Sequence, residues 1–395
     1  MTPPVPAPGL AGAARDLLAE LDETPLVDHH VHGAFRVSPS RTAYGNALNE
    51  ADTDPLPVGV DPFDSQVGFA IRAWCAPVLG LERHARPDDY WARRAQLGED
   101  EVNRRFLAAA GVSHWLVDTG HRADDLLSPE ELVSSSGATA HEVVRLESLA
   151  EQLASEGIEP TRYAADFRAL LAERARGAVA VKSVLAYRAG FDVDLSRPSD
   201  GEVVQHATAW ARDVASTRSV RLTDARLIAF GIHAAVQAGL PLQLHVGLGD
   251  RDLDLRRSDP LLLTDFLRLP EVREVPVLLL HCYPFEREAG YLAQAFQNVH
   301  LDVGLSVNFV GARSTSLVAR SLELAPFDKV LYSSDACGPS DLHYLGARLW
   351  RTAMARVLGG FVDAGEWSRS DASRVIRLLA RDNALRVYDR LTATP

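Results

Sequence analysis

Several short apolar segments of this chain end in residues that bind metal ions, and this recurrence constrains the fold more than any other feature. The terminal residues are His30 and His32, His245, His281 and Asp335. The segments are rich in Leu and Val, and Gly, Pro or small residues follow them. Such runs are typical of strands buried on both faces. We therefore expect parallel strands whose carboxyl ends meet at one rim.

The first of these segments, residues 25–32, carries the histidines at a spacing of two. Side chains alternate along a strand, so His30 and His32 share one face with Asp28, while His29 points the other way. Two neutral imidazoles on one strand can bind a divalent transition metal, and zinc is the first expectation. One histidine at a strand end is more often a packed core residue. The repetition of such ends favours a metal site.

Strand-like and helix-like segments alternate along the whole chain. Eight such units predict an α/β fold, a (β/α)₈ TIM barrel whose catalytic groups lie at the carboxyl ends of the strands. The third strand could equally be the start of a helix. The predicted strands are 25–32, 112–119, 142–147, 178–188, 241–247, 276–283, 299–305 and 329–335.

The expected domain organisation is a short N-terminal part followed by one large domain. Residues 1–24 are predicted to be a tail and a helix, and residues 25–395 to be the barrel. The segment 33–111 is far longer than an ordinary loop, so we expect a helical insertion that caps the barrel. Residues 366–391 are predicted to form two closing helices joined near Asp382.

Composition excludes several classes of partner. The net charge of −12 argues against nucleic acid and against an anionic membrane surface. No apolar run reaches the 18 residues of a membrane span, and the N-terminus does not resemble a secretory signal. Three cysteines are too few for a disulfide framework. We expect a cytoplasmic protein that binds a small molecule, with homo-oligomerisation left open.

Lysine usage singles out one more residue. Of 41 Lys and Arg residues only Lys182 and Lys329 are lysines, and Lys182 lies in an apolar run. Because arginine is used at nearly all other basic positions, a lysine in this apolar run suggests that a compact amine is needed there. Lys182 is either a carbamate that bridges two metal ions or an ammonium that binds a substrate carboxylate. Arg188, at the expected end of the same strand, could bind a substrate carboxylate in a bidentate pair.

The predicted ligands permit hydrolytic chemistry. A zinc-type ion held by His30, His32 and His245 keeps a position for water. Asp335 fits a carboxylate that touches the metal, takes the proton of the water and passes it to a leaving amine. His281 either binds a second ion or donates a hydrogen bond to the polarised carbonyl oxygen. The number of bound metal ions, one or two, therefore remains open.

The motif Asp-His-His-Val-His at residues 28–32, with the later His and Asp ends, resembles the metal-dependent amidohydrolase superfamily. The runs 182–190, 243–254 and 283–290 resemble its amidohydrolase-related proteins of FluG type. The resemblance covers much of residues 178–360 and little of the N-terminal third beyond 28–32. It implies a (β/α)₈ barrel, a divalent metal and hydrolysis of an amide bond. Fusion of some members to a glutamine-synthetase-like domain, which is not expected in this chain, suggests a γ-glutamyl amide as substrate.

Two other functions remain open at this stage. Related barrels are metal-dependent decarboxylases, in which the histidine of the sixth strand handles a proton. A bridging carbamate at Lys182 would favour hydrolysis over decarboxylation. In a non-catalytic sensor, one or more of the metal-binding residues would be missing. In this sequence all of the expected metal-binding residues are present.

Overall fold

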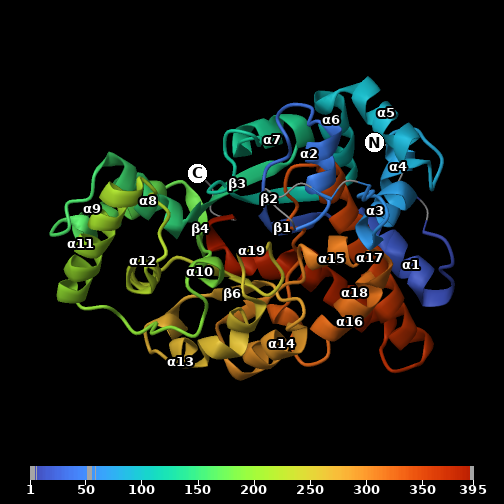
Figure 1. The fold of residues 1–395 in the computed structure, drawn as a ribbon. Helices are drawn as coiled ribbons and strands as arrows, with labels where there is room; N and C mark the ends of the chain where they lie inside the picture. The colour runs from blue at the N-terminus through green and yellow to red at the C-terminus, as the bar shows by residue number, and fades with distance from the viewer. Residues whose placement is uncertain (1–4, 6, 51–55, 58, 392–395) are drawn as a thin grey trace. The chain divides into compact units, whose positions relative to one another are not determined.

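The computed structural model describes residues 5, 7–50, 56–57 and 59–391, and the chain divides into two compact units (Figure 1). Unit 1 consists of Met1–His141 and Asp302–Arg386, and unit 2 consists of Glu142–Leu301 and Val387–Pro395. Residues 1–4 and 6 of the predicted tail lie outside the described residues. The predicted helix after the tail is α1 (Gly12–Glu23).

In unit 1, β1 (Leu26–Val31) pairs in parallel with β2 (Val112–Asp118). All six residues of β1 are buried. On its other side, β1 lies along the extended segment 331–337. His29 N–H donates to the Tyr332 carbonyl at 3.2 Å, and Asp335 N–H donates to the His30 carbonyl at 3.1 Å. These backbone bonds place the end of the segment beside the histidines of β1.

The prediction of a regular eighth strand over residues 329–335 is wrong. Residues Phe327–Lys329 form a 3₁₀ turn, and the segment 331–337 is extended without the regular ladder of a strand. The physical reason lies at Asp335, whose φ of 46° is left-handed and therefore interrupts an extended backbone. Seven of the eight predicted strands are strands in the part of the chain that the structure describes.

The segment between β1 and β2 contains several helices, and its role as an insertion that caps a barrel stays a prediction. Its helices are α2 (Arg41–Asn46), α3 (Gln66–Ala70), α4 (Ala76–Val78), α5 (Pro87–Leu97) and α6 (Glu99–Ala109), with a π-helical turn at Ile71–Cys75.

A buried polar network ties this insertion to the long helix α17 (Ser340–Asp363). Arg94 NH2 lies 2.8 Å from Asp341 Oδ2 and 2.9 Å from Glu99 Oε1. The hydroxyl groups of Tyr44 and Tyr90 both donate to Asp341 Oδ1. Arg94, Asp341 and Glu99 are all buried. A buried guanidinium between two carboxylates holds its partners in one geometry, because each charge depends on the others for solvation.

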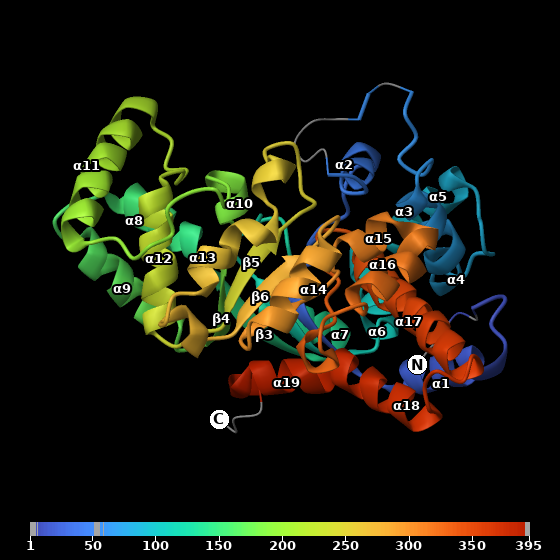
Figure 2. The same ribbon diagram turned by 90° about the horizontal axis from the view of Figure 1, so that it is seen from below.

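Further helices complete unit 1. Figure 2 shows α1 beside α17, and a Cβ at Gly359 would lie 2.5 Å from Ala14 Cα, so the glycine permits this close contact. The predicted closing helices are two helices that meet at a π-helical turn, Leu378–Asp382. The remaining helices of unit 1 are α7 (Pro129–Ser136), α15 (Ser306–Phe309), α16 (Ser314–Ser321), α18 (Arg369–Arg377) and α19 (Asn383–Val387).

Unit 2 contains successive parallel pairings from β3 to β7. The predicted third strand is indeed a strand, which begins at Thr139 and gives way to helix α8 at Leu146. The last strand is shorter than predicted and ends at Leu301. The strands are β3 (Thr139–Arg145), β4 (Ala178–Ser183), β5 (Leu242–Val246), β6 (Val277–His281) and β7 (Val299–Leu301).

Helices separate these strands, as an α/β fold with parallel pairing requires. Between β4 and β5, two of these helices, α11 and α12, follow one another along the chain. The helices of unit 2 are α8 (Leu146–Glu156), α9 (Tyr163–Arg174), α10 (Leu185–Arg188), α11 (Asp200–Thr217), α12 (Ala225–Gln237), α13 (Thr264–Leu267) and α14 (Glu286–Ala295).

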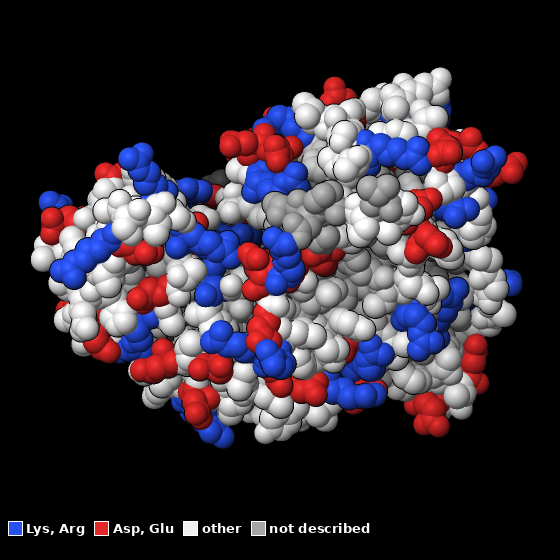
Figure 3. Space-filling view, viewed as in Figure 1, with Lys and Arg blue, Asp and Glu red and all other residues white. Residues whose placement is uncertain are grey.

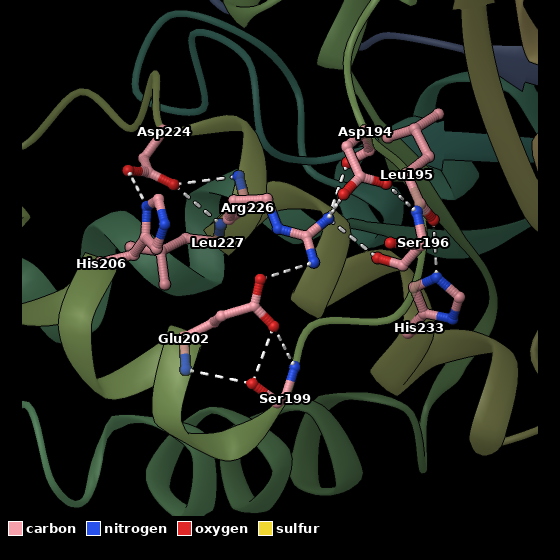
Figure 4. Close-up of polar contacts among 10 residues, drawn as sticks. All are labelled: Asp194, Leu195, Ser196, Ser199, Glu202, His206, Asp224, Arg226, Leu227 and His233. Atoms are coloured by element: carbon pink, nitrogen blue, oxygen red, sulfur yellow. Dashed lines mark hydrogen bonds and ion pairs between the residues drawn. The ribbon is translucent and has the colours of Figure 1, made fainter.

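Capping side chains fix the ends of α11 and α12 (Figure 4). Ser199 and Glu202 form a capping box at the start of α11. Asp224 accepts from two backbone N–H groups at the start of α12 and pairs with His206 at 2.8 Å. Arg226 NH2 lies 3.3 Å from Glu202 Oε1, so it joins the two caps.

On the face shown in Figure 3, acidic and basic side chains are interspersed. Among the described residues, no helix combines the length and the apolar character needed to cross a membrane.

The Arg94 network generates a stability prediction. Arg94→Met should lower the free energy of unfolding by about 3–5 kcal/mol, because it leaves the buried carboxylates of Glu99 and Asp341 without their cation. Arg104→Met, at an exposed pair with Glu101, is the control and should cost less than about 1 kcal/mol. Chemical denaturation measures both changes. If both variants lowered the free energy of unfolding equally, the buried network around Arg94 would not stabilise the insertion.

Candidate metal centre

Three predicted ligands come together in unit 1. His30 and His32 project from β1, and Asp335 ends the extended segment beside it. Asp335 Oδ1 lies 3.0 Å from His30 Nε2 and 3.6 Å from His32 Nε2. One ligand atom from each residue lies within 4.8 Å of the other two. The three side chains therefore converge on one point.

Burial and orientation suit these side chains to hold a divalent ion. His30 is fully buried, and His32 and Asp335 are 6% and 7% exposed. His32 Nδ1 lies 3.1 Å from the Asp118 carbonyl oxygen. A carbonyl oxygen can only accept, so Nδ1 carries the proton and Nε2 presents its lone pair. Two imidazole nitrogens and a carboxylate oxygen are donors that zinc and similar ions prefer, so the residues present fit the implied metal.

The opposite face of β1 is held by a second histidine–carboxylate pair. His29 Nε2 donates to Asp302 Oδ2 at 3.0 Å, and both side chains are fully buried. Ser333 Oγ donates to the other carboxylate oxygen of Asp302 at 2.8 Å. The alternation predicted for residues 28–32 thus separates a structural histidine from the two ligand histidines.

Asp28 is hydrogen-bonded to the segment that carries Asp335. Its Oδ1 accepts a hydrogen bond from Ser334 N–H at 2.9 Å. Burial raises the pKa of Asp28 to about 8, because the charged form loses its hydration in the core. The backbone bond opposes this shift without cancelling it. The carboxyl group of Asp28 therefore anchors the residue next to the ligand Asp335.

The structure adds a residue near this centre that sequence reasoning missed. The ring of His121 lies 5.4 Å from the ring of His32, in the loop that follows β2. The loop is fixed by Gly120 N–H, which donates to Asp118 Oδ1 at 2.9 Å. The available signal was a histidine three residues past the end of β2.

The other two predicted histidine ligands lie together in unit 2. His245 is the last residue but one of β5 and His281 is the last residue of β6, and their ring centroids are 4.7 Å apart. Both are buried. Their proximity agrees with the expectation that the carboxyl ends of parallel strands gather functional side chains. Their assignment as metal ligands stays a prediction.

Lys182 and Arg188 occupy different environments. Lys182 is 2% exposed, and it lies in β4 opposite Gln243 of β5. The prediction that Arg188 ends this strand is wrong: β4 stops at Ser183, and Arg188 lies in the short helix α10. The backbone leaves the strand after Ser183, whose hydroxyl and the following N–H both bond to Glu147.

The side chain of Arg188 has a carboxylate partner. Its NH1 lies 2.9 Å from Glu151 Oε1, and the side chain is 9% exposed. Burial lowers the pKa of Arg188, while Glu151 acts in the opposite direction. Its predicted role in binding a substrate carboxylate stays a prediction.

Removal of single ligands from unit 1 should weaken metal binding. His30→Ala and His32→Ala should each reduce zinc affinity by at least about tenfold, because each removes one nitrogen donor. Zinc titration of metal-free protein against a competing chelator measures the change. His114→Ala, on the same β2 that carries Asp118, is the control and should keep the affinity. Unchanged affinity in both ligand variants would exclude this centre.

The chain is similar to known proteins over parts of its length. Residues 230–390 match the family model described as amidohydrolase. The chain is 32% identical over 222 residues to protein fluG of Emericella nidulans, an alignment that covers 53% of this chain. The chain spans about a quarter of the length of that relative, since the match covers 25% of it.

Solved structures show the same fold. A putative metal-dependent hydrolase from Lactobacillus casei is similar over 98% of this chain and 100% of its own, with a TM-score of 0.83 and 25% identity. A uronate isomerase from Thermotoga maritima matches over 96% of this chain and 98% of its own, with a TM-score of 0.60 and 13% identity. Over residues 230–390 the chain is therefore similar to amidohydrolases, and its fold is similar to that of the putative metal-dependent hydrolase.

Proposed function

We propose that this chain is a metal-dependent hydrolase that cleaves the amide C–N bond of a small carboxylated substrate, with γ-glutamyl amides as the first class to test. The convergence of His30, His32 and Asp335 carries the proposal. Support comes from the family model, described as amidohydrolase, and from the Lactobacillus casei protein, described as a putative metal-dependent hydrolase. Zinc is the proposed ion, because the donors are two nitrogens and one carboxylate oxygen.

His30, His32 and Asp335 would hold the ion. A bound divalent ion of this kind lowers the pKa of water to about 7 and polarises a carbonyl group. Asp335 accepts the proton of the attacking water and delivers it to the nitrogen of the leaving group. As the C–O bond forms and the C–N bond breaks, the same carboxyl group serves as base and then as acid.

The roles predicted for residues of unit 2 stay proposals. His245 is proposed as a further ligand, and His281 as a ligand of a second ion or as a hydrogen-bond donor to the carbonyl oxygen. Lys182 is proposed either as a carbamate bridging two ions or as an ammonium for a substrate carboxylate. A substrate carboxylate that binds Arg188 must compete with Glu151, which already lies 2.9 Å from the guanidinium.

Asp335→Asn tests the reaction. The variant should lose nearly all turnover, at least about 1,000-fold in kcat, because an amide cannot accept the proton of the water. The fold should persist, since Asn tolerates the left-handed backbone that Asp335 adopts. Release of amine or ammonia from γ-glutamyl amides measures turnover, and circular dichroism checks the fold.

Two results would contradict this assignment. Wild-type turnover retained by Asp335→Asn would remove Asp335 from the reaction. Release of carbon dioxide from a carboxylic acid substrate, without amide cleavage by the wild type, would replace hydrolysis with the decarboxylase alternative.

Lys182→Ala separates the two roles of Lys182. If Lys182 is a bridging carbamate, the variant should lose activity, and short carboxylic acids such as formate or acetate should partly restore it by supplying the missing oxygens. The buried position of Lys182 leaves room for a small acid once the side chain is removed. Lys329→Ala, which removes the other lysine, is the control. Loss of activity without rescue would favour the ammonium role.

A further inference from the structure

His343 is hydrogen-bonded to the main chain of the candidate ligand His32, and no prediction from sequence assigned it a role. It belongs to α17, and its side chain is fully buried. Its Nε2 lies 3.0 Å from the His32 carbonyl oxygen, 311 residues away in the sequence. Because a carbonyl oxygen can only accept, Nε2 carries the proton and donates this bond.

The His32 carbonyl lies just beyond the regular ladder of β1. The strand stops at Val31, which is also its last residue in register with β2. His32 is 6% exposed, so its main chain has little access to water. A buried carbonyl beyond a ladder needs a donor from elsewhere, and the side chain of His343 supplies one. His30 differs, because a backbone N–H, that of Asp335, donates to its carbonyl.

The bond from His343 adds to two other bonds that orient His32. His32 N–H donates to the Ala336 carbonyl at 2.9 Å, and Nδ1 of its ring donates to the Asp118 carbonyl at 3.1 Å. The bond from His343 fixes the peptide group that follows His32. The direction of the imidazole depends on that peptide group, because both are attached to the same Cα.

The ring of His343 is itself held in place within unit 1. Its centroid lies 5.8 Å from that of Trp115 in β2, at an interplanar angle of 68°, and Trp115 is fully buried. Two residues earlier in α17, Asp341 accepts a hydrogen bond from the Tyr90 hydroxyl and pairs with Arg94. The start of α17 is therefore anchored on both sides, so His343 presents its N–H from a rigid element.

We propose that His343 is a positioning residue of the candidate metal centre, whose hydrogen bond to the His32 carbonyl holds the His32 imidazole in the orientation that binds the ion. The inference rests on the metal centre of the proposed function. In this role His343 binds neither the ion nor the substrate, and its proton stays on Nε2. The role requires residues of unit 1 alone.

A purely structural role for His343 makes different predictions. A ring that only fills space beside Trp115 could be replaced by a side chain of similar volume with no change in zinc affinity. A positioning bond is lost with the N–H group, and a ligand that is held less firmly binds the ion less tightly. Zinc affinity in variants that keep or lose the donor therefore separates the two roles.

His343→Asn and His343→Gln form the deciding pair. The amide nitrogen of Gln can take the position of Nε2, whereas the shorter Asn ends near the position of Nδ1. We expect Asn to weaken zinc binding by about tenfold, as loss of an outer-shell partner does, and Gln to keep most of the wild-type affinity. Competition with a chelator on metal-free protein measures both values.

Two additions make the result independent of any one variant. His343→Phe fills the volume beside Trp115 without an N–H group, and it should lose as much zinc affinity as His343→Asn. In cobalt-loaded protein, the visible absorption bands report the geometry of the ligands. These bands should change in the Asn and Phe variants and stay as in the wild type in the Gln variant.

His233→Asn is the matched control. His233 is a buried histidine of α12 whose Nε2 also donates to a backbone carbonyl, that of Leu195, at 2.9 Å. The same substitution there removes the same kind of bond, but the acceptor belongs to a residue that is not a proposed ligand. The variant should lower the melting temperature and leave zinc affinity and the cobalt spectrum unchanged.

The outcomes separate this inference from the proposed function. Wild-type zinc affinity and a wild-type cobalt spectrum in the Asn and Phe variants would overturn the role of His343 and leave the metal centre intact. An equal loss of affinity in the Gln and Asn variants would overturn it too, since the reach of the donor would not matter. Failure of the wild-type protein to bind zinc would instead remove the metal centre, and this inference with it.

Discussion

The pairing of β1 with the segment 331–337 is the interaction on which the candidate centre depends. His29 and His30 exchange backbone hydrogen bonds with that segment, and the bond from Asp335 N–H to the His30 carbonyl sets the carboxylate beside both imidazoles. Asp28 adds a side-chain bond to Ser334, one residue before the ligand. Residues about 300 positions apart in sequence thus meet through main-chain contacts, and the donor geometry follows from them.

The positions of these donors are fixed by the fold before any ion binds. The ligands come from a fully buried strand and from a segment bonded to it, so little ordering is needed when an ion binds. The Arg94–Asp341 network lies six residues beyond Asp335 and ties the insertion to the start of α17. The same network that stabilises the insertion therefore also fixes the chain just after the ligand.

Much of this centre could be predicted from sequence because strand periodicity is local. Spacing of two placed His30 and His32 on one face and His29 on the other, and the structure bears this out. The left-handed backbone at Asp335 and the early end of β4 before Arg188 could not be predicted, since neither has a distinct residue signature. His121 was missed because its place beside His32 comes from a ring contact made only in the folded chain.

The central claim is that one divalent ion binds between His30, His32 and Asp335. A crystal structure of the zinc-loaded protein, with data collected on both sides of the zinc absorption edge, tests it most directly. The account predicts an anomalous peak about 2.0–2.2 Å from His30 Nε2, His32 Nε2 and a carboxylate oxygen of Asp335. A fully loaded protein whose zinc peaks all lie away from these three side chains would contradict it.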